Sequence, residues 1–270
     1  MKQQMRSALF VPATRPERFS KALAAGADAV IIDLEDAVEP NAKDGARQRV
    51  ADFAGAHRQV AFYVRVNAHG TPWFDADLAM CASHDNIHSV LLPKAESAAQ
   101  IAPLVQAGKS VLPIVESAKG VLALAELAAA HGVERLSFGS LDLMLDTGTA
   151  PDTKGAGLLL DHIRCEILLH SAAYGLAAPI DGVYPNFSDT AGLAGLAAQV
   201  RDMGFGGMLC IHPAQVATIH EAFAPTAAQI DWARRVVAMA DSTGSFAFQM
   251  DGKMVDAPVI ERARQTIAAI

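Results

Sequence analysis

The sequence predicts a (β/α)8 barrel, an α/β fold also called a TIM barrel, with a short C-terminal extension. Short apolar runs alternate with longer segments of helical periodicity about eight times, without a composition break that would mark a linker. No glycine-rich dinucleotide-binding motif follows the first apolar run. The 270 residues are enough for a full barrel. A doubly wound open sheet is the alternative, but it would normally need fewer units and a cap.

The expected elements follow from this alternation. The expected strands are residues 7–11, 29–33, 60–66, 89–92, 111–115, 135–138, 178–181 and 208–211. The expected helices between and after them are residues 16–25, 42–54, 74–83, 95–107, 120–130, 157–173, 190–203 and 213–222. Eight strands, each followed by a helix, are the number and order of elements in a (β/α)8 barrel.

The last part of the chain does not continue this pattern. Residues 1–230 are expected to form the barrel domain and residues 231–270 a helix-hairpin-helix extension. Alternating apolar residues around Asp251-Gly252 predict a hairpin with a type I′ turn, and a last helix is expected to run to about Ala269. Such an extension can fold over the mouth of its own barrel or that of a neighbouring subunit.

Composition excludes several classes of protein. The net charge is −7 and no basic run interrupts the acidic background, so nucleic acid and anionic membranes are not expected partners. The apolar stretch 8–11 is too short for a signal peptide, and no later run is long enough to span a bilayer. Cys81, Cys165 and Cys210 are too far apart for a CxxC site, and Cys165 and Cys210 are expected to be buried. We expect a cytoplasmic protein.

Polar residues gather at the expected carboxyl ends of the strands, which form one rim in a barrel. They are Asp33, Glu35, Asp36, Arg65, Asn67, Lys94, Glu116, Ser140, Asp142, Asp181 and His212. Carboxylates that converge there would repel each other unless a cation neutralised them, and oxygen ligands select a hard ion such as Mg²⁺. Glu116 and Asp142, from neighbouring strands, are the expected ligands. The alternative is that each caps a helix or turn.

Arg65 ends an apolar strand, where a guanidinium is unexpected unless it meets an anion. It is expected to bind a substrate carboxylate, or to form a buried ion pair with Glu35 or Asp36, and these roles are compatible. Gly139-Ser140-Leu141 could offer successive backbone N–H groups to a substrate carboxylate. A Schiff-base role for Lys94 is disfavoured, since nearby carboxylates would raise its pKa.

Several motifs, taken together, indicate a family. They are Arg6 to Pro12, Asp28 to Val38, Val64-Arg65-Val66-Asn67, Leu92-Pro93-Lys94, Phe138 to Leu143, Asp181-Gly182-Val183-Tyr184, Gly204-Phe205, Ile211 to Gln215 and Asp251 to Asp256. In this order they resemble the citrate lyase β-subunit-like (CitE-like) proteins of the HpcH/HpaI aldolase superfamily. The resemblance implies a TIM barrel, commonly assembled as a trimer, that cleaves citryl, malyl or citramalyl thioesters with magnesium.

The resemblance also implies roles for individual residues. Glu116 and Asp142 match metal ligands, Arg65 matches a substrate arginine, and Glu35 and Asp36 match acids that hold the metal's waters and Arg65. Asp256 matches an acid that reaches the site of an adjacent subunit, although it could instead cap the last helix. Arg15, Arg18 and Lys21 could contact coenzyme A phosphates or could belong to a solvated helix. The stretch 147–155 departs from the family pattern, which leaves the remote substrate contacts open.

The expected activity is therefore a magnesium-dependent retro-Claisen cleavage of a 3-hydroxyacyl thioester into a 2-oxo acid and an acetyl thioester. Arg65 would stabilise the departing enolate and Asp256 would protonate it. The alternatives are a subunit that acts only on a carrier-protein-bound substrate, a thioester hydrolase such as a malyl-CoA thioesterase, and a non-catalytic scaffold.

Overall fold

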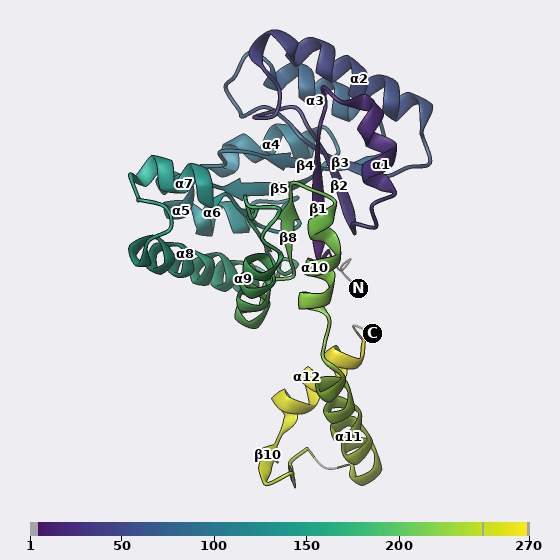
Figure 1. The fold of residues 1–270 in the computed structure, drawn as a ribbon, viewed down its shortest axis with the longest axis vertical. Helices are drawn as coiled ribbons and strands as arrows, with labels where there is room; N and C mark the ends of the chain where they lie inside the picture. The colour runs from purple at the N-terminus through teal and green to yellow at the C-terminus, as the bar shows by residue number, and fades with distance from the viewer. Residues whose placement is uncertain (1–4, 245, 269–270) are drawn as a thin grey trace. The chain divides into compact units, whose positions relative to one another are not determined.

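A computed structural model describes residues 5–244 and 246–268 (Figure 1). It separates into two compact units, Met1–Phe223 and Ala224–Ile270, and each is described by itself. The first unit is a closed barrel of eight parallel strands in the order β1 to β8, in which β1 pairs with both β2 and β8. The predicted (β/α)8 barrel is confirmed.

The strands of the barrel are short and lie one after another along the chain. They are β1 (Ser7–Pro12), β2 (Ala29–Asp33), β3 (Phe62–Arg65), β4 (Ile87–Leu92), β5 (Ser110–Val115), β6 (Ser137–Phe138), β7 (Ile180–Asp181) and β8 (Gly207–Cys210). Strands β6 and β7 are only two residues long, shorter than expected.

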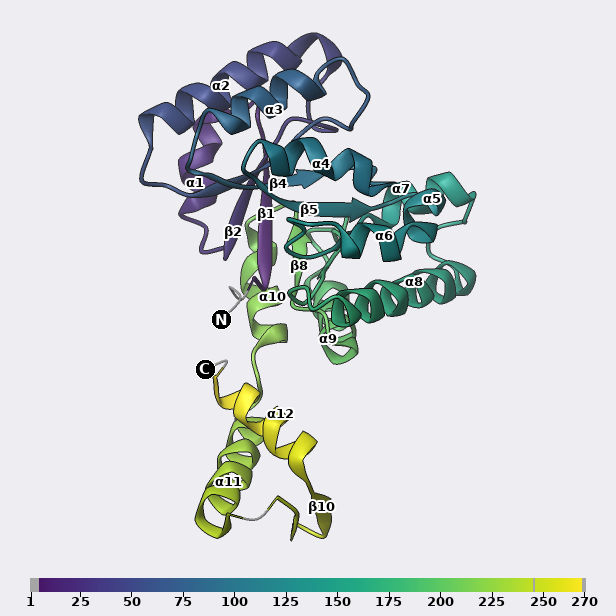
Figure 2. The same ribbon diagram turned by 180° about the vertical axis from the view of Figure 1, so that it is seen from behind.

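Helices connect the strands and cover the outside of the barrel (Figures 1 and 2). They are η1 (Pro16–Arg18), α1 (Phe19–Leu23), η2 (Pro40–Ala42), α2 (Lys43–Ala56), α3 (Phe74–Ala82), α4 (Ala98–Gln106), α5 (Ala118–Leu122), α6 (Leu124–Ala129), α7 (Ser140–Thr147), α8 (Lys154–Ala173), α9 (Thr190–Met203) and α10 (Ala214–Phe223). The helix expected over 120–130 is two helices, α5 and α6. Helix α7 was not predicted.

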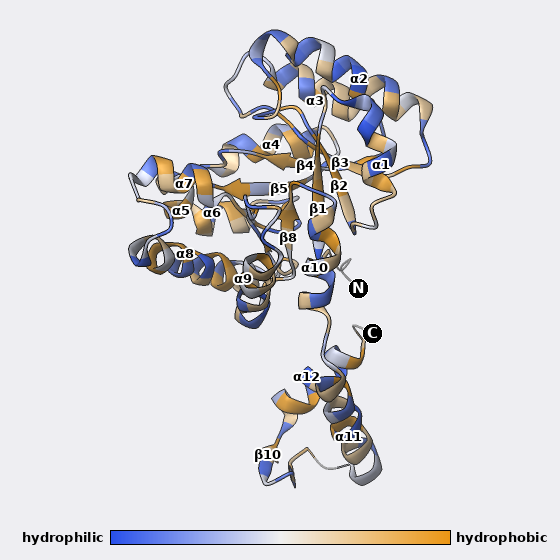
Figure 3. Ribbon diagram, in the orientation of Figure 1, coloured by the Kyte–Doolittle hydropathy of each residue, from blue (hydrophilic) through white to orange (hydrophobic). Residues whose placement is uncertain are grey.

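Two apolar layers follow from the alternation of side chains along each strand. On β2, Val30 and Ile32 belong to the layer between strands and helices, whereas Ala29 and Ile31 face the barrel interior. In Figure 3 the strands carry mainly hydrophobic residues, whereas α2 also carries many hydrophilic ones. None of the helices in the described part of the chain has the length and apolar character that a membrane span requires.

Two of the three cysteines are buried, and the third is not. Cys81 and Cys210 lie in the interior, but Cys165 is exposed, so the expectation that it is buried is wrong. It lies on α8 between Ile163 and Ile167, which are one helical turn apart and face the core. The position of Cys165 therefore falls off the buried face.

The second unit contains α11 (Ala227–Thr243), the strands β9 (Phe248–Met250) and β10 (Lys253–Val255), and α12 (Ala257–Ala268). The two strands pair antiparallel across the predicted Asp251-Gly252 turn, where both residues have positive φ. The unit has its own apolar cluster, which includes Val236, Val255 and Ile260. The predicted end of the last helix, Ala269, lies outside the described residues.

Candidate active site

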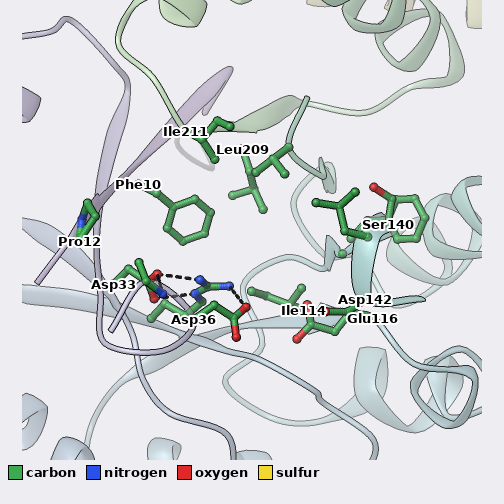
Figure 4. A pocket seen from close by; sticks show the side chains of 16 residues that line it. Phe10, Pro12, Asp33, Asp36, Ile114, Glu116, Ser140, Asp142, Leu209 and Ile211 are labelled. Atoms are coloured by element: carbon green, nitrogen blue, oxygen red, sulfur yellow. Dashed lines mark hydrogen bonds and ion pairs between the residues drawn. The ribbon is translucent and has the colours of Figure 1, made fainter. Parts of the chain in front are cut away.

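A cavity of about 450 Å³ opens at the carboxyl ends of the barrel strands (Figure 4). Its lining combines acidic, basic and apolar side chains. They belong to Phe10, Pro12, Asp33, Asp36, Ala37, Arg65, Ile114, Glu116, Phe138, Gly139, Ser140, Leu141, Asp142, Val183, Leu209 and Ile211. The cavity therefore collects residues from strands far apart in sequence, as the barrel topology requires.

The period-2 alternation of the strands explains why the polar residues face this cavity. Ile31 and Tyr63 face the barrel interior, and two positions further along the same strands come Asp33 and Arg65. Glu116 likewise follows the inward-facing Ile114. Inward positions that are apolar in the middle of the barrel thus become polar at its mouth.

Arg65 is held mainly by Asp33. The two residues are partners in the parallel register of β2 and β3, and Nε and Nη2 of Arg65 donate to the two oxygens of Asp33, each at 2.7 Å. Arg65 Nη1 lies 3.1 Å from Glu35 Oε2 and 3.5 Å from Asp36 Oδ2. Sequence reasoning proposed Glu35 or Asp36 as partners and missed Asp33, although the strand register pairs it with Arg65.

These contacts keep the guanidinium charged. Burial alone would lower the pKa of Arg65, but the carboxylates of Asp33, Glu35 and Asp36 outweigh it and raise the pKa above its ordinary value. The ring of Phe10 covers the guanidinium at 4.8 Å from Cζ. Arg65 is therefore a cation that the carboxylates and the ring of Phe10 hold in a fixed position.

Glu116 is a buried carboxylate with a confined position. Its Oε1 accepts the backbone N–H of Lys94 at 2.7 Å, and a Cβ at Gly139 would overlap its carboxylate. Burial and the charges of Glu35 and Asp142 raise the pKa of Glu116 to about 8, although the hydrogen bond from the Lys94 N–H acts to lower it. Ser117, whose side chain accepts the N–H of Gly120, caps α5, so Glu116 does not serve as that cap.

Lys94 has an unusual backbone conformation for a lysine, with φ of 51°. Its Nζ donates to Glu35 Oε1 at 2.5 Å and lies 3.9 Å from Asp36 Oδ1. Burial would lower the pKa of Lys94, but Glu35, Asp36 and Glu116 raise it, so the amine stays protonated. This agrees with the expectation that nearby carboxylates raise the pKa of Lys94 and disfavour a Schiff base. The backbone contact of Lys94 with Glu116 was missed, because only the fold brings residues 94 and 116 together.

Asp142 lies in the first turn of α7, and Gly139 is the N-cap residue of that helix. First-turn N–H groups of a helix lack intrahelical acceptors and favour an anion. The Gly139 N–H, however, donates to Val115 O at 3.0 Å, so it is not available to a substrate as expected. Ser140 and Leu141, which also line the cavity, are the remaining candidates for this contact.

The other predicted residues lie elsewhere. Arg18 and Lys21 line a separate cavity of about 320 Å³ together with His212, whereas Arg15 is exposed and pairs with Glu17 at 3.7 Å. Asp256 belongs to the second unit, where it directly precedes α12. Within the described residues its Oδ1 is buried and has no hydrogen-bond partner.

The donor set fits a hard divalent cation. Glu116 and Asp142 line the same cavity, and no described basic residue other than Arg65 lines it with them. Burial and the charges of Glu35 and Asp142 raise the pKa of Glu116, so a cation bound there would stabilise its charged form. Among the described residues no cluster of three or more His, Cys, Asp or Glu side chains suits a metal. Magnesium binds through one or two carboxylates and keeps waters, which is the number available here.

Comparison with known protein families gives one match over most of the chain. The model for HpcH/HpaI aldolase/citrate lyase matches residues 6–213. A citrate lyase subunit beta-like protein from Mycobacterium tuberculosis is 40% identical over 259 residues, which are 94% of this chain and 92% of the relative. A (3S)-malyl-CoA thioesterase from Cereibacter sphaeroides is 37% identical over 279 residues, which are 97% of this chain and 93% of the relative.

A solved structure resembles the whole chain. It is the protein CitE from Mycobacterium tuberculosis in complex with magnesium, acetoacetate and coenzyme A. The TM-score is 0.87 at 36% sequence identity, and the match covers 100% of this chain and 99% of that one.

Proposed function

The chain belongs to the HpcH/HpaI aldolase/citrate lyase family, and from this premise we propose that it is a magnesium-dependent carbon–carbon lyase. The substrate is a 3-hydroxyacyl thioester, which retro-Claisen cleavage converts into a 2-oxo acid and an acetyl thioester. The observation that carries this proposal is the pair Glu116 and Asp142, which face one cavity beside a fixed guanidinium. The CitE structure with magnesium and coenzyme A supports the choice of ion and of thioester.

In this proposal Glu116 and Asp142 hold the magnesium ion. When bound, magnesium would supply a Lewis acid that polarises the carboxylate and hydroxyl oxygens of the substrate. The backbone N–H groups of Ser140 and Leu141, at the start of α7, orient the substrate carboxylate. Glu35 and Asp36 keep Arg65 in place, together with Asp33.

The bond that breaks joins the carbon bearing the hydroxyl to the carbon next to the thioester. The hydroxyl loses its proton to solvent water, that carbon becomes the ketone of the 2-oxo acid, and the bonding electrons pass to the thioester enolate. Arg65 keeps one N–H, on Nη2, beyond those that Asp33, Glu35 and Asp36 contact, and this group would stabilise the enolate oxygen. We propose that Asp256 then donates the proton that forms the acetyl thioester, and that it comes from a neighbouring copy in a homotrimer.

The remote end of the thioester is proposed to be coenzyme A. Arg18 and Lys21 line the cavity next to the site, which shares Phe10, Pro12 and Ile211 with it, and they can pair with phosphates. Arg15, on the same segment but outside this cavity, remains a weaker candidate. The protein is proposed to act in the cytoplasm, where coenzyme A esters are made.

A hydrolase is the second candidate, favoured by the similarity to the (3S)-malyl-CoA thioesterase. In that reaction water would attack the thioester carbonyl, with Arg65 again stabilising the negative oxygen. The products would be a free hydroxy acid and a free thiol, without a 2-oxo acid.

The deciding experiment follows both products. Purified protein with Mg²⁺ is incubated with citramalyl, malyl and citryl thioesters of coenzyme A, and 2-oxo acid and free thiol are measured. Release of 2-oxo acid that EDTA abolishes is the expected result. Free thiol without 2-oxo acid would establish the hydrolase instead. Turnover only of substrates bound to an acyl carrier protein would establish a subunit that depends on a carrier.

A further inference from the structure

Two motifs of the sequence have no part in the proposed reaction, Asp181-Gly182-Val183-Tyr184 and Ile211 to Gln215. They lie at the carboxyl ends of the neighbouring strands β7 and β8, and each supplies a residue to the lining of the candidate site, Val183 and Ile211 (Figure 4). Ile211 also lines the adjoining cavity of about 320 Å³, together with His212. The loop after β8 therefore forms the junction between the two cavities.

A buried glutamine, Gln215, holds the loops after β7 and β8 together. It belongs to α10 and is only 1% exposed. Its Oε1 accepts the N–H of Ile211 at 2.9 Å and that of His212 at 3.2 Å, and its Nε2 donates to Tyr184 O at 2.8 Å. Both N–H groups lie just past Cys210, where β8 ends. One amide thus binds the loop after β8 through its oxygen and the loop after β7 through its nitrogen.

Helix capping explains only part of this arrangement. The ring of His212 accepts the Ala214 N–H at 3.2 Å, and Gln215 Oε1 accepts the His212 N–H, which is the pattern of a capping box at the start of α10. A capping box needs only an acceptor from the third residue, and glutamate supplies one as well as glutamine does. The donor to Tyr184 O requires the amide, and this bond joins two different loops.

The loop after β7 is itself anchored, so the Gln215 amide has a fixed partner. The hydroxyl of Tyr184 donates to Asp189 Oδ2 at 2.6 Å, and the other oxygen of Asp189 accepts the Gly192 N–H at 2.9 Å as the cap of α9. The rings of Phe187 and His212 also stack between the two loops, with centroids 4.8 Å apart. The junction between the cavities is therefore tied to a neighbour that α9 holds in place.

We infer that Gln215 is a positioning residue that places Ile211 and His212 for the thioester arm of the substrate, so that its loss weakens binding of coenzyme A and spares the metal site. The inference rests on the proposed function, which assigns coenzyme A to the adjoining cavity. The proposed metal ligands Glu116 and Asp142 follow β5 and β6, whereas the Gln215 amide binds the loops after β7 and β8. A displacement of roughly 1 Å at a binding surface can cost about 100-fold.

The test measures the affinity of the whole protein for coenzyme A and for Mn²⁺ by calorimetry. Gln215→Met keeps the length of the side chain and removes the amide. Its dissociation constant for coenzyme A should rise by ~10-fold to 100-fold, and that for Mn²⁺ should change by less than ~3-fold. In turnover, KM for the thioester should rise with little change in kcat, because a contact to the remote arm contributes equally before and during the reaction. Unchanged coenzyme A affinity of the folded variant would overturn the inference.

Gln215→Glu separates the link between the loops from the helix cap, and it has the shape of glutamine if the methionine variant does not fold. The carboxylate still accepts both N–H groups but cannot donate to Tyr184 O. Its affinity for coenzyme A should therefore lie between those of the wild type and Gln215→Met. Wild-type affinity would overturn the inference. Weaker binding than that of Gln215→Met would also overturn it, since repulsion of the coenzyme A phosphates would then be the cause.

Gln100 offers a matched control in the same barrel. It forms the capping box of α4, and its Oε1 accepts the N–H groups of Glu96 and Ser97 as Gln215 accepts those of its own loop. Glu96 and Ser97 are not among the lining residues of the two cavities. Gln100→Met should lower the unfolding temperature about as much as Gln215→Met and leave coenzyme A affinity unchanged. An equal loss of affinity in both variants would show general loosening of the barrel and would overturn the inference.

The binding measurements separate this test from that of the proposed function. Weaker binding of coenzyme A by Gln215→Met than by the wild type supports the inference even if no 2-oxo acid is released, an outcome that would reject only the lyase. Release of 2-oxo acid together with unchanged coenzyme A affinity of the variant would reject only the inference. A wild type that does not bind coenzyme A would reject both the inference and the choice of coenzyme A.

Discussion

Lys94 shows how much of the site chemistry is set by the backbone of a single residue. With φ of 51° its N–H reaches Glu116 while its side chain reaches Glu35. The other described non-glycine residues with positive φ are Asp152 and Asp251, a residue type that tolerates this conformation better than lysine does. Strained backbone at such a place is typical of functional sites. Lys94 is best described as a positioning residue that fixes two carboxylates.

Lys94→Gly and Lys94→Ala separate the backbone role from that of the amine. Both keep the N–H to Glu116, so Mn²⁺ affinity should change by less than ~10-fold, whereas the loss of the contact to Glu35 should lower turnover by about 10-fold to 100-fold. Only glycine relieves the positive φ, so the glycine variant should be more stable than the alanine variant by ~1 kcal/mol in denaturant unfolding. Equal stability of the two variants would argue against strain at this position.

Glu116→Gln tests the proposed metal ligand. It should lower Mn²⁺ affinity and turnover by ~100-fold or more, and Asp142→Asn should do the same, because each removes one of two charged ligands. The loss can be measured by calorimetry and by the absence of a thermal shift with Mg²⁺. Full turnover of either variant in EDTA would end the metal assignment.

Glu116→Gln lowers metal affinity and turnover, but it should raise the stability of the folded protein when no metal is bound. The pKa of Glu116 is raised from 4.5 to about 8 by burial and by Glu35 and Asp142. The unfolded chain therefore releases this proton at lower pH than the folded chain, and folded-state stability is lost as pH rises from about 4.5 to 8. In EDTA, Glu116→Gln should unfold at a higher temperature than the wild type at pH 8, and the difference should shrink towards pH 4.5.

The sequence was informative about which residue types line the site and less so about their contacts. Parallel strands place their carboxyl ends together, so Glu116, Asp142 and Arg65 could be assigned to one rim. The pairing of Asp33 with Arg65 follows from strand register, and the Lys94 N–H contact follows from a single φ angle. Neither can be read from residue types alone.

Among the elements, the long strands and helices follow from periodicity and the short ones do not. Strand β7 has two residues, too few to show an alternation, and its predicted start was two residues early. Helix α7 was not predicted, because the Gly139-Ser140 dipeptide is typical of turns and the helix that follows has only eight residues. The rim residues nevertheless stay in place, since the first turn of α7 extends the end of β6.

Helix α10 is tied to the bottom of the barrel by a histidine, and this link should depend on pH. His220 Nε2 lies 2.7 Å from the buried Ser7 Oγ and 3.5 Å from Asp28 Oδ2, and Arg6 pairs with the same carboxylate. Burial lowers the pKa of His220 from 6.5, and Arg6 lowers it further, although Asp28 opposes the shift. As the pH falls, the unfolded chain therefore binds this proton at a higher pH than the folded chain does. The contribution of this link to the stability of the fold is complete above pH 6.5 and is lost as the pH falls below it.

His220→Gln isolates this effect, since glutamine can keep a hydrogen bond to Ser7 and does not titrate. The free energy of unfolding of the wild type should fall more steeply than that of the variant between pH 6.5 and 5. Asp28 does not contribute in this range, because its pKa is lowered from 3.8. At pH 7.5, His220→Ala should cost ~1–2 kcal/mol, since Ser7 Oγ loses its partner. Parallel pH profiles of wild type and His220→Gln would contradict the proposed link.

For the whole molecule, the division into two units raises the question of what the smaller one contributes. Its apolar core, which residues of α11, β10 and α12 form, is small. A unit of fewer than roughly 60 residues is only marginally stable by itself. Within the described residues Asp256 Oδ1 is buried there without a hydrogen-bond partner. A buried carboxylate oxygen without a partner costs stability, which is usually tolerated for a functional reason.

Asp256→Asn, combined with subunit mixing, tests the proposed role of this acid. Alone, the variant should bind Mn²⁺ normally and lose ~100-fold to 10,000-fold in turnover, the usual share of a positioned acid or base. Mixing it, after mild denaturation and refolding, with Glu116→Gln should restore part of the activity, because a copy with intact Glu116 can then receive Asp256 from a neighbour. Two Asp256→Asn preparations mixed in the same way serve as the control. No recovery would place Asp256 in the site of its own copy, and unchanged turnover of the single variant would leave it only as a cap of α12.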